Sequence, residues 1–376
     1  MTLAFGWFLS MGIRVTVPAL LPYIRAEFGF DLTTAGLLLT LLWSAYALGQ
    51  FPGGILADWA GERTVLVTST ALGAVAAVVV AAAVTPVTVL VAIVGLGLTT
   101  ALYGPTRFTI LSDIYDRRDG VAMGLTQSAG HVGNAVVPVV AGTIAAAVSW
   151  RAGFVYTIPA FLLTAVGLWL VIPTRTGADA TDEAVLPSPR YVCRQLVDPR
   201  VAGLTVVLLL VMFVIQAFTG FYTTYLTEIK EFRPATAAAL FGLFYASGTV
   251  VQPVAGAGGD RFSATRVMCV ALAIGLIPMV AFPFVDGLYP VAGLTLAAGA
   301  LLGVTPVALA RLVRGLPADM NGTGLGLLRT VYFLGGATGP LVFGAFANRG
   351  RFEVAFGLLA GLVVATLLLA VLVGSD

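Results

Sequence analysis

The chain has 376 residues, of which 59% are hydrophobic and only 10% are charged, with a formal net charge of +2. Soluble domains usually carry about 25% charged residues, so this composition excludes a protein that folds in water. The basic residues form no strongly basic stretch, which argues against nucleic acid as a partner. Cys193 and Cys269 are far apart in the sequence and show neither a metal-ligand spacing nor a disulfide framework.

Apolar stretches long enough to cross a bilayer recur along the chain, since a spanning helix needs about 20 mainly apolar residues. In lipid every backbone polar group needs a partner within its own segment, so spans of this length must be helical. The predicted spans are 3–23, 34–56, 65–84, 87–111, 121–147, 152–172, 201–226, 235–257, 265–284, 288–310, 322–346 and 353–373. The sequence therefore predicts an all-α polytopic membrane protein of about twelve transmembrane helices.

The loops between these spans predict an orientation, because short cytoplasmic loops retain positive charge. With Met1 inside, the cytoplasmic loops hold 11 Arg residues, whereas the opposite loops hold 6 Lys and Arg residues. We therefore expect a multi-pass protein of the plasma membrane with both termini in the cytoplasm. The segment 173–199 is the one long polar stretch and is predicted to be a cytoplasmic linker between two six-helix halves, 1–172 and 200–376.

The two halves contain a weak internal repeat at a constant offset of 202 residues. This offset superimposes Gln50, Gly54, Asp58 and Gly73 on Gln252, Gly256, Asp260 and Gly275. It also superimposes Gly120, Gly124, Leu125, Gly133, Pro138, Gly142 and Phe154 on Gly322, Gly326, Leu327, Gly335, Pro340, Gly344 and Phe356. Glycine is common in this chain, so the Gln, Asp and Pro matches carry most of the weight. They predict two parallel six-helix repeats.

A short motif lies between the second and third predicted spans. It contains Gly54, Asp58, Gly61 and Arg63, and its copy in the second half contains Gly256, Asp260 and Arg261. This motif resembles the signature loop of the major facilitator superfamily, although Trp59 and Thr64 stand where basic residues are usual and the copy lacks the later glycine. Asp113 stands at the end of the fourth span, where that family places an acid that can bridge to the Arg of the loop.

The resemblance covers both halves and implies a transporter that alternates between two states around a site near the bilayer midplane. It implies that Asp58, Arg63 and Asp113 form an inner gate, with Asp260 and Arg261 as its counterpart. An Asp that faces a helix N-terminus is attracted to it by only a few tenths to about 2 kcal/mol. Such an attraction favours one transport state over the other without locking the protein in it. The plainer interpretation is that Asp58 and Arg63 are solvated turn residues. We expect a monomer in the lipid bilayer that moves a small molecule and needs no cofactor.

Charged residues inside spans are expensive, at about 2.5 kcal/mol or more at a helix centre, and point to function. Arg14 and Arg329 lie deep in their spans, and the 202-residue offset pairs them with Gln216 and Gln127. We predict that Arg14 and Arg329 bind an anion, while the competing interpretation is a buried Arg satisfied by backbone carbonyls. Arg107 lies near the end of its span, where it would snorkel or meet Asp113, so we predict a structural role.

The fifth span carries a polar stripe formed by Gln127, His131 and Asn134, at helical spacings of four and three residues. A polar face of a membrane helix is expected to point inward, so these three residues complete the predicted substrate site together with Gln216. His131 is the only histidine and titrates in the physiological range, which makes it the candidate proton carrier. A lone histidine is equally compatible with a hydrogen-bonded packing role.

The residues within the spans and loops separate several classes of function. No span places a nucleophile and base, paired carboxylates or a metal-ligand set at mid-depth, so we predict neither an enzyme nor a metal site. No Gly-Lys phosphate-binding loop occurs, which argues against an ATP-driven pump. The leading hypothesis is a secondary carrier of an anion or organic acid. A proton-coupled drug or metabolite exporter and a transporter-like membrane sensor remain open.

Overall fold

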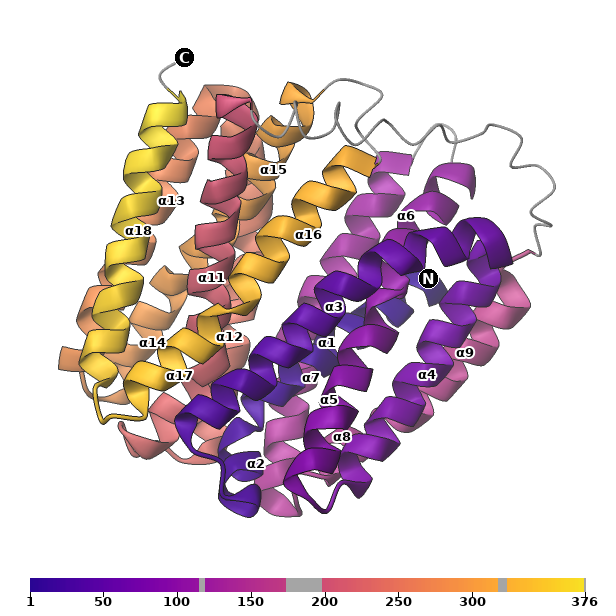
Figure 1. Cartoon of the computed structure of the whole chain (residues 1–376), viewed down its shortest axis with the longest axis horizontal. Helices are drawn as coiled ribbons and strands as arrows, with labels where there is room; N and C mark the ends of the chain where they lie inside the picture. The colour runs from indigo at the N-terminus through magenta and orange to yellow at the C-terminus, as the bar shows by residue number, and fades with distance from the viewer. Residues whose placement is uncertain (115–118, 174–197, 317–322, 375–376) are drawn as a thin grey trace. The chain divides into compact units, whose positions relative to one another are not determined.

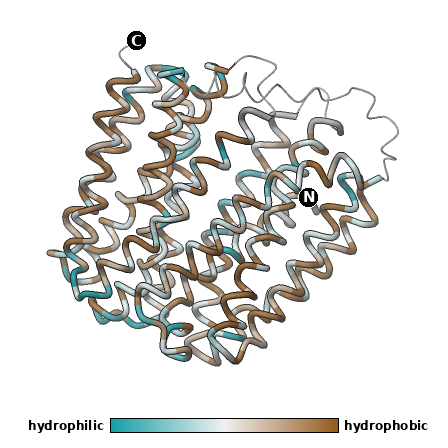
Figure 2. The backbone as a smooth tube through the Cα atoms, in the orientation of Figure 1, coloured by the Kyte–Doolittle hydropathy of each residue, from teal (hydrophilic) through white to brown (hydrophobic). Residues whose placement is uncertain are grey.

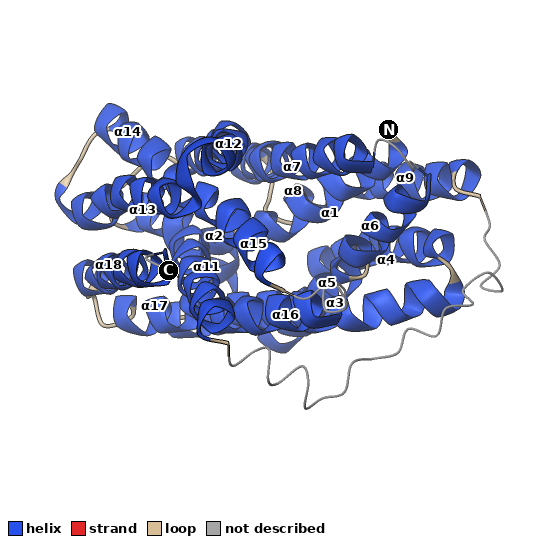
Figure 3. Ribbon diagram, turned by 90° about the horizontal axis from the view of Figure 1, so that it is seen from above, coloured by secondary structure: helices blue, strands red, loops and turns tan. Residues whose placement is uncertain are grey.

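The computed structural model describes residues 1–114, 119–173, 198–316 and 323–374, but not the side chains of residues 58, 112, 113, 119–121 and 323–325. Every regular element in these ranges is helical, and no strand occurs among them (Figure 3). The prediction of an all-α protein is therefore confirmed.

The helices before the polar segment are α1 (Thr2–Ala19), α2 (Leu21–Phe28), α3 (Leu32–Ala60), α4 (Glu62–Ala82), α5 (Pro86–Ala101), α6 (Tyr103–Ile114), α7 (Asp119–Ala147), α8 (Ala152–Val155) and α9 (Ile158–Val171) (Figure 1). Those after it are α11 (Pro199–Glu228), α12 (Pro234–Gly258), α13 (Ala264–Ala281), α14 (Leu288–Ala298), α15 (Val304–Gly315), α16 (Thr323–Ala337), α17 (Gly339–Ala347) and α18 (Phe352–Gly374). A π-helical turn η2 (Gly259–Ser263) joins α12 to α13, and 3₁₀ turns η3 (Phe282–Phe284) and η4 (Gly299–Gly303) follow α13 and α14.

Eleven helical segments of the described chain are long and apolar enough to cross a membrane. One of them, Pro234–Phe284, has 51 residues and contains both α12 and α13, so it is long enough for two crossings. Brown apolar residues run along most helices in Figure 2. These segments agree with the predicted set of about twelve spans.

The described chain forms two compact units. The first unit contains Met1–Phe30, the described residues of Leu37–Glu183, and Tyr222–Gly242. In it α1 packs along α7, and α4 packs on both α5 and α9. The second unit contains Asp31–Gly36, the described residues of Ala184–Phe221, and Leu243–Asp376. Its α13 packs on both α14 and α18.

Several predicted spans are broken by proline, which has no N–H to donate to the carbonyl four residues earlier. The predicted span 3–23 divides at Leu20, just before Pro22 at the start of α2. Pro22 leaves the Pro18 carbonyl without its usual helical donor, and the Thr223 hydroxyl donates to this carbonyl at 2.7 Å. A side chain thus replaces the lost backbone donor at the kink.

The same effect divides three other predicted spans. Span 87–111 breaks at Leu102, three residues before Pro105, and span 152–172 breaks before Pro159. Span 322–346 breaks at Thr338, before Pro340. The predicted spans were correct as membrane-crossing segments, but each of these is two helices joined at a kink.

The repeat is visible in the helix boundaries. Helices α3, α4 and α5 begin at Leu32, Glu62 and Pro86, and α12, α13 and α14 begin at Pro234, Ala264 and Leu288. Each later start lies 202 residues after its counterpart, as in the sequence repeat. Helix starts that match at one constant offset indicate that the two series of helices are copies of one structural repeat.

Candidate functional site

A close contact between α1 and α7 positions the most polar region of the first unit. A Cβ on Gly133 would clash with the Phe8 carbonyl group, and one on Gly130 would clash with the Trp7 indole. Small residues allow this approach in membrane helices, where packing replaces the hydrophobic effect as the force that holds helices together. The approach brings Trp7 of α1 against Gly130 of α7.

Arg14 is buried, with 1% of its surface exposed. Its Nε donates to the Ser10 carbonyl at 3.0 Å and its Nη2 to the Met11 sulfur at 2.9 Å. The guanidinium carbon lies 3.7 Å from the centre of the Tyr46 ring, in cation–π geometry. Its Nη1 has no hydrogen-bond partner among the described residues, and Arg14 forms no described ion pair. The one backbone carbonyl that Arg14 contacts therefore satisfies only part of the hydrogen-bonding capacity of its guanidinium group.

Arg107 does not snorkel, contrary to one expectation from the sequence, because only 1% of its surface is exposed. Its guanidinium carbon lies 3.7 Å from the centre of the Trp7 ring, and its Nη2 donates to Gln127 Oε1 at 2.6 Å. The Arg14 guanidinium lies 5.6 Å from the same indole centre. Trp7 thus brings both arginines into one cluster. The other expected partner, Asp113, lies outside the described side chains.

The predicted polar stripe of α7 includes two residues in contact. The Gln127 side-chain nitrogen lies 3.2 Å from His131 Nε2, and Arg107 lies on the opposite side of the Gln127 amide. Asn134 is buried at 7% exposure, and its side-chain oxygen has no hydrogen-bond partner among the described residues. We call Trp7, Arg14, Tyr46, Arg107, Gln127 and His131 the arginine cluster.

The two remaining predicted substrate residues belong to the second unit. Gln216 of α11 is 4% exposed, and its side-chain oxygen lacks a hydrogen-bond partner among the described residues. Arg329 of α16 is partly buried, with an Nε that also lacks such a partner. Both side chains therefore have unused hydrogen-bonding capacity within the described structure.

The signature motif is mostly helical and not a loop. Helix α3 continues through Gly54 and position 58 to Ala60, and Gly61 alone separates it from α4 with φ at +79°. The predicted gate partners Asp58 and Asp113 lie outside the described side chains. Arg63 stacks on Trp169 of α9, with its guanidinium carbon 4.0 Å from the ring centre.

The second copy of the motif lies in the π-helical turn η2 of the second unit. Asp260 accepts a hydrogen bond at 2.8 Å from Arg314 at the end of α15, and both side chains are about 70% exposed. The sequence did not predict Arg314 as this partner. Arg261 follows Asp260 in the motif, and its guanidinium carbon lies 5.8 Å from the ring centre of Phe262. Exposed pairs of this kind contribute only about 0–1 kcal/mol.

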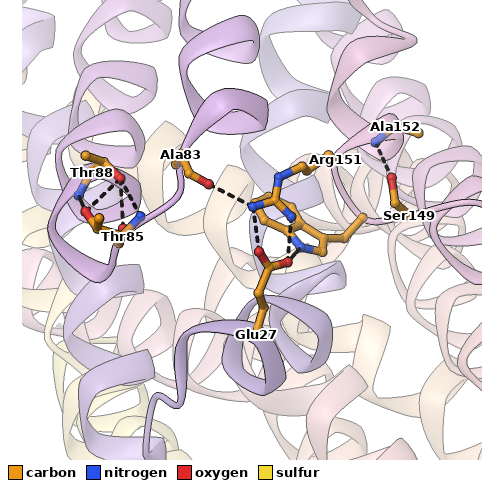
Figure 4. Close-up of polar contacts among 8 residues, drawn as sticks. Glu27, Ala83, Thr85, Thr88, Ser149, Arg151 and Ala152 are labelled. Carbon is orange, nitrogen blue, oxygen red and sulfur yellow. Dashed lines mark hydrogen bonds and ion pairs between the residues drawn. The ribbon is translucent and has the colours of Figure 1, made fainter.

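A second charged cluster lies in the predicted outer loops of the first unit (Figure 4). Glu27 of α2 accepts hydrogen bonds from Arg151 at 2.5 and 2.6 Å and from the Trp150 indole at 2.6 Å. Arg151 also donates to the Ala83 carbonyl at 2.8 Å. The hydrogen bonds from Arg151 and Trp150 hold the pKa of Glu27 below its ordinary value, and the bond from Arg151 has the larger effect. Nearby, Arg25 of α2 pairs with Glu228.

Sequence reasoning missed the aromatic half of the arginine cluster. Trp7 and Tyr46 lie among apolar residues of their spans, and only Trp7 is connected to an arginine by its spacing, since Arg14 follows it by seven residues on the same helix. That spacing was the usable signal, because residues seven positions apart lie two turns along one face of a helix. Here Trp7 is 3% exposed, and its Nε1 has no hydrogen-bond partner among the described residues.

Known proteins share both the sequence pattern and the fold. The chain is 27% identical to the probable sulfoacetate transporter SauU of Cupriavidus necator, over 93% of this chain and 87% of that protein. It is 26% identical to the membrane sensor protein UhpC of Escherichia coli K12, over 69% of this chain and 64% of that protein.

Among solved structures, an inward-facing bacterial homologue of the lysosomal transporter Spinster has a TM-score of 0.77 at 18% identity, covering 100% of this chain and 94% of that one. The nucleoside transporter NupG has a TM-score of 0.78 at 14% identity, covering 99% and 98%. At these identities the likeness concerns the fold alone. The sequence pattern of the Major Facilitator Superfamily matches residues 3–340 and 204–375. Together with the helical repeat and the signature motif, this match shows that the chain belongs to the Major Facilitator Superfamily of membrane transporters.

Proposed function

We propose that this transporter is a secondary carrier of a small organic anion, and that Arg14 is its principal anion-binding residue. One observation carries the proposal: Arg14 is buried, has a free Nη1 donor, and forms no ion pair with a described side chain. A buried charge without a counter-charge is costly in a protein interior. A transported anion would supply the missing acceptor and the missing charge.

The chemistry of the arginine cluster fits an organic acid. Arginine presents a planar fork of donors that matches the paired oxygens of carboxylate or sulfonate groups. The relative named as a probable sulfoacetate transporter supports this class, since sulfoacetate carries one group of each kind. We further propose that His131 carries the coupled proton and that Gln127 and Asn134 contact the substrate. The substrate-binding roles of Gln216 and Arg329 stay predictions.

The test is uptake and binding of sulfoacetate by the purified protein. Ligand that binds the folded state raises apparent thermal stability by mass action, so a thermal-shift screen against sulfoacetate, acetate and a cationic dye reports binding directly. Proteoliposome uptake then reports transport. We expect Arg14→Gln to abolish both, while Arg349→Gln, which neutralises an exposed arginine, leaves both unchanged.

Arg14→Lys is informative because it keeps the charge and loses the fork. We expect it to weaken sulfoacetate binding by about 1.5–3 kcal/mol, the scale of a hydrogen bond to a charged group. The absence of anion binding at millimolar concentration, or normal uptake by Arg14→Gln, would refute the proposal. Competition by cationic dyes, with efflux intact in Arg14→Gln, would instead favour a drug exporter.

A membrane sensor is the second candidate, because one relative carries that name. A sensor would bind its ligand without moving it. Sulfoacetate binding in the thermal-shift assay, combined with no counterflow in proteoliposomes of confirmed orientation and integrity, would favour this function over a carrier.

A further inference from the structure

The indole of Trp7 has a buried hydrogen-bond donor without an acceptor in the described chain. Trp7 is 3% exposed, and its Nε1 has no hydrogen-bond partner among the described residues. The Trp150 indole, in contrast, donates to Glu27 at 2.6 Å. Among the described tryptophans, only Trp7 has a buried N–H in this condition. Because buried polar groups almost always have a partner, this N–H calls for an explanation.

Aromatic and cation–π contacts hold the Trp7 ring in its orientation. Tyr103 stacks on it with the ring centroids 6.1 Å apart, and the Arg107 guanidinium carbon lies 3.7 Å from the ring centre. Contacts of this kind use the faces of an aromatic ring. They leave the ring edge that carries Nε1 to other neighbours.

That edge of the indole faces α7 at Gly130. A Cβ on Gly130 would lie 2.3 Å from Trp7 Nε1 and 3.1 Å from Met11 Cγ. Position 130 has no side chain, so none extends from it over the N–H. Within a helix the backbone carbonyls accept from N–H groups four residues later, so α7 offers the indole no free carbonyl beside Gly130. The N–H is therefore uncovered and lacks an acceptor.

A second unpartnered donor, Nη1 of Arg14, lies near Trp7. The other end of the Arg14 fork, Nη2, contacts the sulfur of Met11 at 2.9 Å, and Met11 also borders Gly130 beside Nε1. The Arg14 guanidinium carbon lies 5.6 Å from the centre of the indole. Two hydrogen bonds of about 2.9 Å that meet at one oxygen span up to about 5.8 Å. A single small anionic group can therefore reach both donors.

We propose that Trp7 is a substrate-binding residue, whose indole N–H donates to the anionic group that Arg14 holds. The inference rests on the proposed anion transport. Arg14 supplies a charged donor and Trp7 a neutral one, so the site recognises acceptor oxygens as well as charge. A carboxylate or sulfonate has enough oxygens to accept from both donors. Gly130 keeps the N–H available to the substrate.

The first test detects the hydrogen bond itself. The chain has five tryptophans, so ¹⁵N-tryptophan labelling gives five indole N–H signals in NMR spectra, and Trp7→Phe identifies the signal of Trp7. Saturating sulfoacetate should move this signal downfield, because a hydrogen bond to an anion deshields the proton. The Trp150 signal is the internal control, since its N–H already donates to Glu27. A Trp7 signal that stays in place at saturation would overturn the proposal.

The second test measures how much the N–H contributes to binding. Replacement of Trp7 by benzothienylalanine exchanges the N–H for a sulfur and keeps the ring system that contacts Tyr103 and Arg107. We expect sulfoacetate to bind about 10- to 100-fold more weakly, the factor for one hydrogen bond to a charged group. The same replacement at Trp59, which is 85% exposed, should leave the affinity unchanged.

Melting temperatures without ligand show whether the Trp7 replacement folds like the wild type. Equal sulfoacetate affinity in the folded replacement and the wild type would overturn the role of Trp7. If the replacement does not fold, the NMR measurement decides, because it uses the wild-type protein. A wild type that binds no sulfoacetate would overturn the proposed function itself. Binding that depends on Arg14 but leaves the Trp7 signal in place would overturn only this inference.

Discussion

At the scale of single residues, Tyr46 is the side chain that makes a buried Arg14 tolerable. The Arg14 guanidinium stacks on the Tyr46 ring, and no described carboxylate balances its charge. A cation–π contact contributes about 0.5–1 kcal/mol at exposed sites and about 2 kcal/mol or more when desolvated. The aromatic face thus replaces part of the solvation that Arg14 loses on burial.

This contact predicts the effect of two substitutions. Tyr46→Leu removes the aromatic face and should lower stability by about 1–3 kcal/mol, from the lost cation–π contact and altered packing. Tyr46→Phe keeps the face and should cost markedly less. Melting temperatures of both purified variants, followed by intrinsic fluorescence, provide the comparison. Equal losses in the two variants would show that the hydroxyl, and not the ring, supports Arg14.

At the scale of helices, the α1–α7 contact determines whether the arginine cluster forms at all. A side chain at position 133 would meet the Phe8 carbonyl group, which is backbone and has no rotamer with which to yield. Gly133→Ala should therefore destabilise the protein by about 1–3 kcal/mol, as overpacking does. Gly124→Ala is the matched control on the same helix, because a Cβ there meets nothing within 4 Å. A Gly133→Ala variant as stable as the control would contradict this packing.

The bond between Glu27 and Arg151 predicts a dependence of stability on pH. The folded-state pKa of Glu27 lies below its ordinary value of 4.5, so its stabilisation is complete above pH 4.5 and is lost as the pH falls through the lower folded-state value. Wild type should exceed Glu27→Gln in melting temperature at pH 7, and the difference should shrink towards pH 3.5. Because both side chains are about one-third exposed, we expect a small effect. Glu353→Gln, at an exposed carboxylate of α18, serves as the control, and a difference that grows in acid would refute the assignment.

The fold was more predictable than the surroundings of the site. Arg14 was recognisable because its depth in the span can be estimated from its sequence position, and a charge at mid-span is costly. Only the snorkelling alternative for Arg107 was wrong, because the kink at Leu102 places this residue in the middle of α6 and against Trp7. Contacts of this kind depend on helix rotation and kinks, which hydropathy does not encode. The helical continuation of α3 through the signature motif was missed for the same reason.

At the scale of the whole molecule, the asymmetry of positive charge is the feature that predicts how the chain crosses the membrane. The predicted cytoplasmic loops carry 11 basic residues and the opposite loops carry 6. Translocation of short loops disfavours Lys and Arg, so the side with more of them should face the cytoplasm. Two exposed apolar residues, at opposite predicted ends, allow a direct test. They are Val148, between α7 and α8, and Phe262, in η2, with exposures of 76% and 73%.

In a background without Cys193 and Cys269, we expect Val148→Cys to react with a membrane-impermeant maleimide in intact cells. Phe262→Cys should react only after the membrane is permeabilised, because its loop is predicted to face the cytoplasm. Their similar exposure means that a difference in labelling reflects sidedness and not burial. Labelling of Phe262→Cys alone in intact cells would invert the orientation. Both termini and the 173–199 linker would then lie outside the cell, and a proton entering from outside would reach the arginine cluster from the opposite end of the helices.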